Sequence, residues 1–172
     1  MDWTLEENIS KLSLRIREIL DVEDFIEDID ELVFKLGGQL EEVDFIENFA
    51  DAKITKHDDT FTITVCRQPE TRRRFTIAHE LGHLFLHMGY GLDRELWNSN
   101  ENSEFFRCQS NRLEYQAHAF AAAFLMPKEL FREVMLKNYE DGSFYMDEVA
   151  NYFGVSLEAA INRAKFLNMI SW

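Results

Sequence analysis

At the centre of the chain stands the pentapeptide His79-Glu80-Leu81-Gly82-His83. Apolar residues recur around it at helical spacing, which predicts a helix with Thr71 as its N-cap and Met88-Gly89-Tyr90-Gly91 as its end. Two histidines four residues apart on a helix project from one face, where they can hold a zinc ion together. Glu80 between them can take a proton from water bound to the metal. The same three side chains would also suit a partly solvated helix face.

A catalytic zinc ion usually takes three protein ligands and keeps one position for water, so a third donor must come from elsewhere. A second helix is predicted over residues 111–127, where an alanine-rich run stops near Pro127. Such a helix can lie close to another one, and Glu114 and His118 would then share the face turned toward the metal. Glu114 is therefore our candidate for the third ligand. His118 is its competitor, or a partner that orients Glu114 or a substrate group.

His87 is a weaker candidate for the metal itself. It lies eight residues beyond His79, about 12 Å along a continuous helix, which is too far for all three histidines to share one tetrahedral ion. A structural role and a role in orienting a ligand both stay open for His87. A donor for the oxyanion of peptide hydrolysis would come from His87, His118, Tyr90 or Tyr115, which the sequence does not rank.

The remaining segments predict a mainly helical α+β fold. Further helices are expected at residues 5–20, 24–36, 128–137, 144–153 and 156–169, and strands at residues 39–43, 52–56 and 60–67, the last two as a hairpin. In the clearest strand, Thr60, Thr62 and Thr64 alternate with apolar residues. Exposed strand edges recruit extended peptides by backbone hydrogen bonds, so this strand is a candidate for pairing with a substrate. An ordinary sheet strand is the simpler alternative.

A single domain is expected over residues 1–172, because 46% hydrophobic residues can bury one sizeable core. Its parts would be an acidic helical region at about 1–38, the sheet and both motif helices at about 39–127, and a region resembling a helix-turn-helix unit at about 128–172. Without a long apolar run or a signal segment, the protein is expected to be cytoplasmic and not to contact a membrane.

The negative charge is concentrated at the start of the chain. Of the net charge of −14, nearly all comes from residues 1–51, which hold 16 acidic and 4 basic side chains. Such a surface repels nucleic acid and attracts basic proteins, so we expect no direct DNA binding. A merely solvated pair of acidic helices explains the charge equally well. In the turn and two helices over residues 147–167, which look like a helix-turn-helix unit, Arg163 and Lys165 are the only basic residues. This favours packing or protein docking over phosphate binding.

Three segments carry a resemblance to a known family. They are the stretch from Arg73 to His87, the pattern Glu114-x-x-Ala117-x-x-Phe120-Ala121, and Leu125-Met126-Pro127. Together they resemble the ImmA/IrrE metallopeptidases over most of the chain, and only loosely over the first fifty residues. The resemblance implies a zincin-like fold, with a small mixed or antiparallel sheet of about three strands packed on the helix that carries the His-Glu-x-x-His motif.

The same resemblance implies a gluzincin-like site with His79, His83 and Glu114 as ligands of Zn²⁺ and Glu80 as the general base. Another divalent metal such as Mn²⁺ is an alternative. Many members carry an acidic residue two places after the ligand glutamate and an asparagine two places later, where this chain has Gln116 and His118. The first difference favours Glu114 as the ligand.

Members of that family act inside bacterial cells on helix-turn-helix repressors of mobile elements, prophages or stress genes. The resemblance therefore implies an intracellular zinc endopeptidase that cleaves such a repressor and relieves repression. The alternative is a non-catalytic antirepressor that binds the repressor, with the metal holding only the fold. An open coordination position separates the two, because a structural zinc ion usually has four protein ligands.

Overall fold

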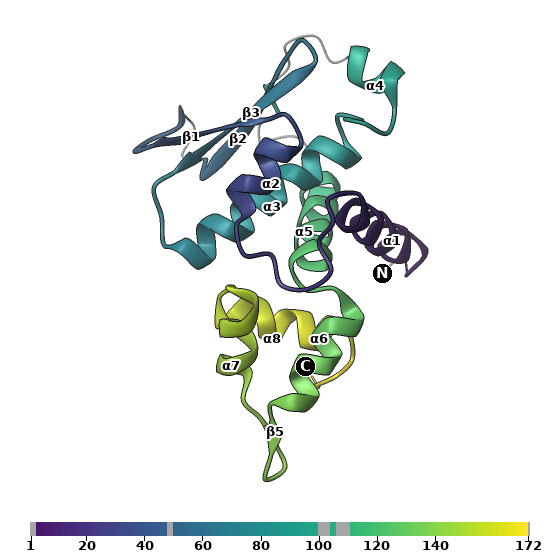
Figure 1. Ribbon diagram of the computed structural model, residues 1–172, viewed down its shortest axis with the longest axis vertical. Coiled ribbons are helices and arrows are strands. Elements are labelled where there is room, and N and C mark those ends of the chain that lie inside the picture. Colours follow the sequence, from purple (N-terminus) through teal and green to yellow (C-terminus); the bar gives the residue numbers. More distant parts are fainter. Residues whose placement is uncertain (1–2, 48–49, 100–103, 106–110, 172) are drawn as a thin grey trace.

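The computed structural model describes residues 3–47, 50–99, 104–105 and 111–171, and Figure 1 shows how its elements are arranged. The helices are α1 (Trp3–Ile19), α2 (Ile29–Lys35), α3 (Glu70–Leu86), α4 (Arg94–Ser99), α5 (Asn111–Leu125), α6 (Lys128–Lys137), α7 (Met146–Phe153) and α8 (Leu157–Phe166). The strands are β1 (Gln39–Val43), β2 (Ala52–His57), β3 (Thr60–Cys66), β4 (Glu104–Phe105), β5 (Tyr139–Glu140) and β6 (Ser143–Phe144). The mainly helical α+β class is as predicted.

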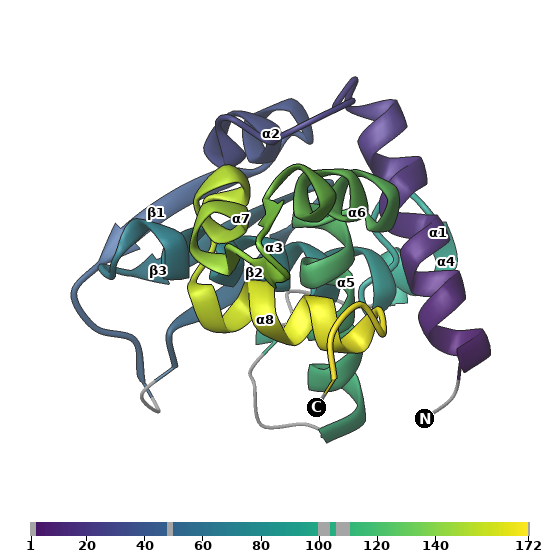
Figure 2. The same ribbon diagram turned by 90° about the horizontal axis from the view of Figure 1, so that it is seen from below.

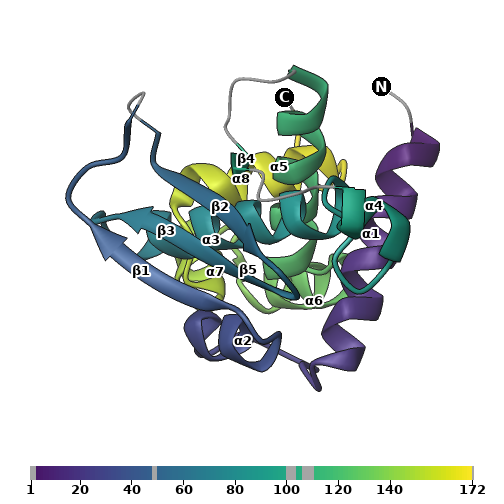
Figure 3. The same cartoon turned by 90° about the horizontal axis from the view of Figure 1, so that it is seen from above.

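The main sheet contains the three predicted strands and the two-residue β4, in the order β1-β3-β2-β4. It is mixed, since β1 runs parallel to β3 while the other pairs are antiparallel (Figure 3). Strand β3 is hydrogen-bonded to a neighbour along both edges. Thr60, Thr62 and Thr64 therefore belong to an interior strand. The alternative in which this strand pairs with a substrate is wrong, because both of its backbone edges are already used.

Helix α3 lies between the sheet and α5. It contacts β2 and β3 on one side and α5 on the other, while α1 packs against α5. Its interior is buried on every side from Thr76 to Phe85, which is typical of a helix enclosed by a core. Among the largest fully buried side chains are residues of the sheet, both motif helices and the C-terminal helices: Phe61, Ile63, Ile77, Leu81, Leu84, Phe120, Phe124, Phe131 and Phe153.

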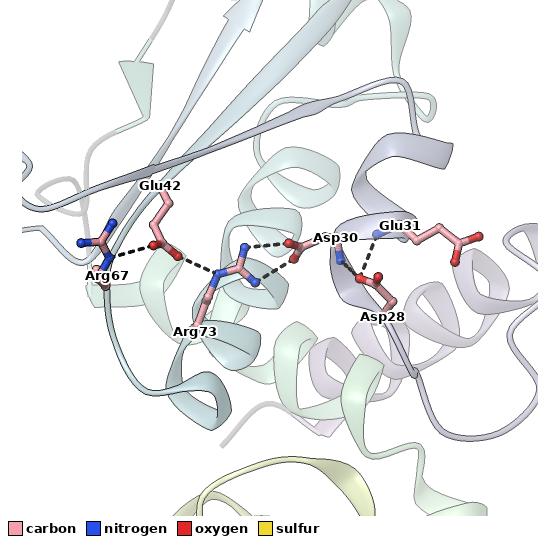
Figure 4. Close-up of polar contacts among 6 residues, drawn as sticks. All are labelled: Asp28, Asp30, Glu31, Glu42, Arg67 and Arg73. Carbon is pink, nitrogen blue, oxygen red and sulfur yellow. Dashed lines mark hydrogen bonds and ion pairs between the residues drawn. The ribbon is translucent and has the colours of Figure 1, made fainter.

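A chain of charged groups ties α2 and β1 to the start of α3 (Figure 4). The Arg73 guanidinium donates two hydrogen bonds of 2.8 Å to the Asp30 carboxylate, and its Nε lies 3.6 Å from Glu42. Glu42 in turn accepts a 3.0 Å hydrogen bond from Arg67. The Arg73 side chain is 13% exposed, so this bidentate pair is shielded from solvent and fixes the amino-terminal end of α3.

Two predicted helix starts are wrong. The α2 helix begins at Ile29 rather than near residue 24, because the Asp28 carboxylate caps it by accepting hydrogen bonds from the backbone N–H groups of Asp30 and Glu31. The α3 helix begins at Glu70, with Pro69 at the N-cap position, so Thr71 already lies inside the first turn. None of the helices in the described part of the chain is long and apolar enough to cross a membrane.

Helices α6, α7 and α8 pack at one end of α3 and α5, as Figures 1 and 2 show. Gly154, with φ of +60°, ends α7, and the Ser156 hydroxyl accepts a hydrogen bond from the backbone N–H of Ala159 at the start of α8. The Arg163 Nε donates to the Met126 carbonyl at 3.0 Å and so joins α8 to the end of α5. Buried apolar residues of α7 and α8 belong to the same core cluster as those of α3.

Candidate metal centre

The His-Glu-x-x-His motif lies in the most deeply buried part of α3. His79 and Glu80 are 1% exposed and His83 is 2% exposed. The alternative of a partly solvated helix face is therefore wrong, since all three side chains are almost completely buried. Burying ionisable side chains costs free energy unless they are hydrogen-bonded, paired or bound to a metal. The motif is thus built for a specific partner.

Three donor groups converge on one point between α3 and α5. The Nε2 atoms of His79 and His83 are 3.0 Å apart. The Glu114 carboxylate oxygens lie 3.2 Å from His79 Nε2 and 3.4 Å from His83 Nε2. Bonds of about 2.0 to 2.1 Å in a tetrahedral zinc site place neighbouring ligand atoms about 3.3 Å apart. These distances therefore outline one face of such a tetrahedron, and the three residues fit a zinc ion.

The cluster offers three protein ligands. Among the described residues, no fourth histidine, cysteine, aspartate or glutamate joins His79, His83 and Glu114. A tetrahedral ion held by three ligands keeps a position for water or substrate, which is typical of a catalytic zinc site.

Glu114 reaches the histidines because α3 and α5 approach each other closely. A Cβ added to Gly82 would stand 2.9 Å from Ala117 Cα and 3.0 Å from the Ala117 carbonyl oxygen, so only glycine fits there. Ala117 lies three residues after Glu114, about one helical turn away. The contact between Gly82 and Ala117 therefore sets how far the Glu114 carboxylate extends toward the histidines.

His87 stands behind His83, on the side away from the three-ligand cluster. The two Nδ1 atoms are 2.9 Å apart, and His87 Nε2 lies 3.0 Å from the Gln116 amide oxygen. An amide oxygen only accepts, so His87 Nε2 carries a proton and its Nδ1 accepts one from His83 Nδ1. His83 Nε2 then keeps its lone pair for a metal. Burial lowers the pKa of His87, which favours the neutral ring that this arrangement needs.

Two of the four oxyanion candidates already donate their hydroxyl protons within the fold. Tyr90 donates to the Leu36 carbonyl oxygen at 2.5 Å. Tyr115 donates to the Glu6 carboxylate, and burial together with this hydrogen bond raises the pKa of Tyr115 to about 12. To serve an oxyanion, either tyrosine would first have to give up its present acceptor.

His118 is placed differently. Its ring packs edge-on against the His79 ring, with 4.6 Å between the centroids, and also contacts the Phe75 ring at 5.6 Å. Both histidines line a cavity of about 640 Å³ that is bounded by α3, α5 and α8. His118 thus adjoins the metal cluster on the side where a substrate has room. The wall formed by α8 was not predicted, because it depends on packing between segments far apart in the sequence.

Comparison with known proteins places these observations in a family. The sequence matches the family model described as the IrrE N-terminal-like domain over residues 40–165. Among solved structures, a Mycobacterium tuberculosis transcriptional regulator aligns with a TM-score of 0.60 and 20% identity, over 92% of this chain and 46% of that chain. The chain thus spans about half the length of that protein, and the likeness shows a shared fold. A search of curated proteins gave no match. Because the family model covers well over half of the chain, the protein belongs to the ImmA/IrrE peptidase family.

Proposed function

We propose that this protein is a zinc-dependent endopeptidase that cleaves a helix-turn-helix transcriptional repressor and thereby relieves repression. The observation that carries the proposal is the three-ligand cluster of His79, His83 and Glu114 beside a cavity. A zinc ion that only held the fold together would usually be enclosed by four protein ligands. Here the cavity next to His79 leaves room for a peptide at the metal.

A zinc ion held by these residues would polarise the scissile carbonyl and lower the pKa of a bound water toward 7. Glu80 is the general base in this scheme. Its carboxylate takes a proton from the attacking water and delivers it to the leaving nitrogen. The burial of Glu80 keeps bulk water from competing for that proton. His118, which lines the cavity and packs against the His79 ring, is the best-placed side-chain donor for the oxyanion.

Two observations support a repressor as the substrate. The family resemblance implies action on such repressors, and a protein of similar fold is named a transcriptional regulator. Helix-turn-helix proteins present basic surfaces to DNA, and the acidic first 51 residues of this chain are complementary in charge to such surfaces. The experiment therefore uses the helix-turn-helix repressor encoded nearest to the gene of this protein.

The zinc-loaded protein is incubated with that repressor, and fragments are identified by mass spectrometry. Glu80→Gln is compared with Glu129→Gln, which changes an exposed glutamate on α6. We expect fragments from the wild type and from Glu129→Gln, none from Glu80→Gln, and equal zinc content in all three. If Glu80→Gln still releases the repressor from its operator without cleaving it, the antirepressor alternative replaces this proposal.

A further inference from the structure

The cavity beside the metal cluster has an apolar wall on part of its surface. Helix α3 contributes Phe75, α5 contributes Ala119 and Ala122, and α8, which crosses in front of them in Figure 2, contributes Ala159 and Phe166. All five side chains are half-buried. The three alanines leave space that larger residues would fill. The result is a concave apolar surface that reaches the rings of His79 and His118.

A buried positive charge borders this apolar space. Arg163 lines the cavity and is 4% exposed, yet among the described residues its guanidinium makes a single hydrogen bond, from Nε to the Met126 carbonyl. A guanidinium has five N–H donors, so four are left for other partners. The Cζ atom of Arg163 lies over the Phe166 ring, 5.7 Å from the ring centroid. Burial lowers the pKa of Arg163 to about 10, and no acidic group offsets this effect.

Arg17, the other buried arginine at the end of α5, makes three hydrogen bonds within the fold. Arg17 is 2% exposed and donates to the carbonyl oxygens of Phe124, Glu23 and Asp24. Burial lowers its pKa to about 10, as it does for Arg163, although Asp24 partly offsets the effect at Arg17. Arg17 is absent from the lining of the cavity. Within the described part of the chain, Arg163 therefore makes fewer hydrogen bonds than Arg17, although both guanidinium groups are almost completely buried. The remaining donors of Arg163 are available to a ligand in the cavity that this residue lines.

We propose that the cavity is a substrate subsite in which Arg163 holds a carboxylate of the bound peptide. The inference rests on the proposed peptidase function, because the cavity begins at His79. The hydrocarbon part of the peptide residue that carries this carboxylate lies against Phe75 and Ala159, and the carboxylate accepts hydrogen bonds from the Arg163 guanidinium. A carboxylate that accepts two N–H groups from arginine in a shielded site forms a strong and directional contact.

The acidic groups around the cavity do not neutralise Arg163. Asp51 is paired with Arg72 at 2.8 Å, and Glu158 is exposed to solvent at the first turn of α8. The net charge of −14 discourages anions from approaching the protein at large. Selectivity for a carboxylate would thus arise locally at Arg163. A cavity of about 640 Å³ admits more than one residue, so the carboxylate can belong to an acidic side chain or to the end of the peptide.

Binding of peptides is measured by fluorescence anisotropy with the zinc-loaded Glu80→Gln protein. The assay therefore reports binding whether or not the wild type cleaves the peptide. The probes are labelled alanine-rich dodecapeptides in which each position in turn is Glu, Gln or Leu, each made with a free or an amidated carboxyl terminus. We expect Glu at one position to bind roughly tenfold or more tightly than Gln there. If the preference follows the free carboxyl terminus instead, the Arg163 site stands and takes a chain end.

Arg163→Gln in the same background should remove the preference, whereas the matched Arg17→Gln should keep it. Circular dichroism checks that each variant folds. Because Arg163 also binds Met126, Ala159→Phe serves as a second variant that narrows the cavity one helical turn from Arg163. It too should remove the preference, and it decides the question if Arg163→Gln does not fold.

The inference is overturned if Glu and Gln bind equally at every position with either terminus, or if the preference survives in folded Arg163→Gln. Failure of the proposed function looks different. In that case the wild type cleaves no substrate, while the carboxylate preference in the binding assay and its loss in Arg163→Gln are still observed.

Discussion

Gly82 of α3 and Ala117 of α5 touch so closely that a Cβ on Gly82 would stand 2.9 Å from the Cα of Ala117. The residues of the candidate metal site lie on both sides of this contact, His79 and His83 on α3 and Glu114 on α5. Helix interiors usually disfavour glycine by about 1 kcal/mol relative to alanine, so the close approach outweighs that preference here. The spacing of the two helices is therefore part of the metal site.

Gly82→Ala should weaken zinc binding as well as the fold. The added methyl group pushes α5 away and carries Glu114 with it, while overpacking of this kind costs about 1 to 3 kcal/mol of stability. Isothermal titration with zinc and urea denaturation measure the two effects. Gly38→Ala is the matched control, since its Cβ would clash with the Phe61 ring at 2.3 Å rather than with α5. If both variants bind zinc equally well, the Gly82 contact does not set the ligand geometry.

Removal of the metal should lower the melting temperature. A ligand present at about 100 times its Kd stabilises the folded state by about 2.7 kcal/mol, which corresponds to roughly 5 to 10 °C for a chain of this size. Calorimetry with zinc and with a chelator measures the shift. Glu114→Gln should lose most of it, because an amide is a poor zinc ligand, whereas Glu80→Gln should retain it. An equal shift in both variants would argue against Glu114 as a ligand.

The motif helices and the hairpin of the sheet could be predicted because their signals are local. Predicted residues 128–137 coincide with α6, since apolar spacing and the preceding Pro127 define that helix. The β5–β6 hairpin was missed although Asp141-Gly142 carried a signal. Both residues have positive φ, 50° and 81°, which is typical of a two-residue hairpin turn. The short α4 was also missed, because six residues give too little periodicity.

The surroundings of the site were harder to predict than its ligands. The spacing of His79 and His83 is fixed by one helix, and the register of α5 brings Glu114 to them. The cavity instead depends on the position of α8. A hydrogen bond from Arg163 to Met126, which is 37 residues earlier in the chain, holds α8 against the end of α5. No local pattern encodes such a contact. For the same reason, sequence alone did not show that Tyr90 and Tyr115 are already hydrogen-bonded to Leu36 and Glu6.

Disrupting the hydrogen bonds behind His83 should weaken metal binding without removing a ligand. His87→Ala leaves the His83 ring free to turn or to place its proton on Nε2, and loss of such an orienting partner typically costs 10- to 100-fold in affinity. Gln116→Leu removes the final acceptor and should act in the same direction. Gln116→Glu keeps an acceptor for His87 Nε2 and should bind zinc like the wild type. Competition with a chromogenic chelator gives the zinc dissociation constant of each of the three variants. If Gln116→Leu and Gln116→Glu weaken zinc binding equally, this account is contradicted.

The hydrogen bond between Tyr115 and Glu6 makes one part of the stability dependent on alkaline pH. Burial, together with this hydrogen bond, raises the pKa of Tyr115 from 10 to about 12, so the folded state favours the protonated hydroxyl. The stabilisation is therefore complete below pH 10 and is lost as the pH rises through 12. Since Tyr115 is 42% exposed, solvent screening limits it to about 1 kcal/mol or less. Urea denaturation should show the wild type more stable than Tyr115→Phe by a constant amount from pH 7 to 9, with the difference shrinking above pH 10. A difference that stays constant through pH 12 would mean that Glu6 does not hold the tyrosine proton.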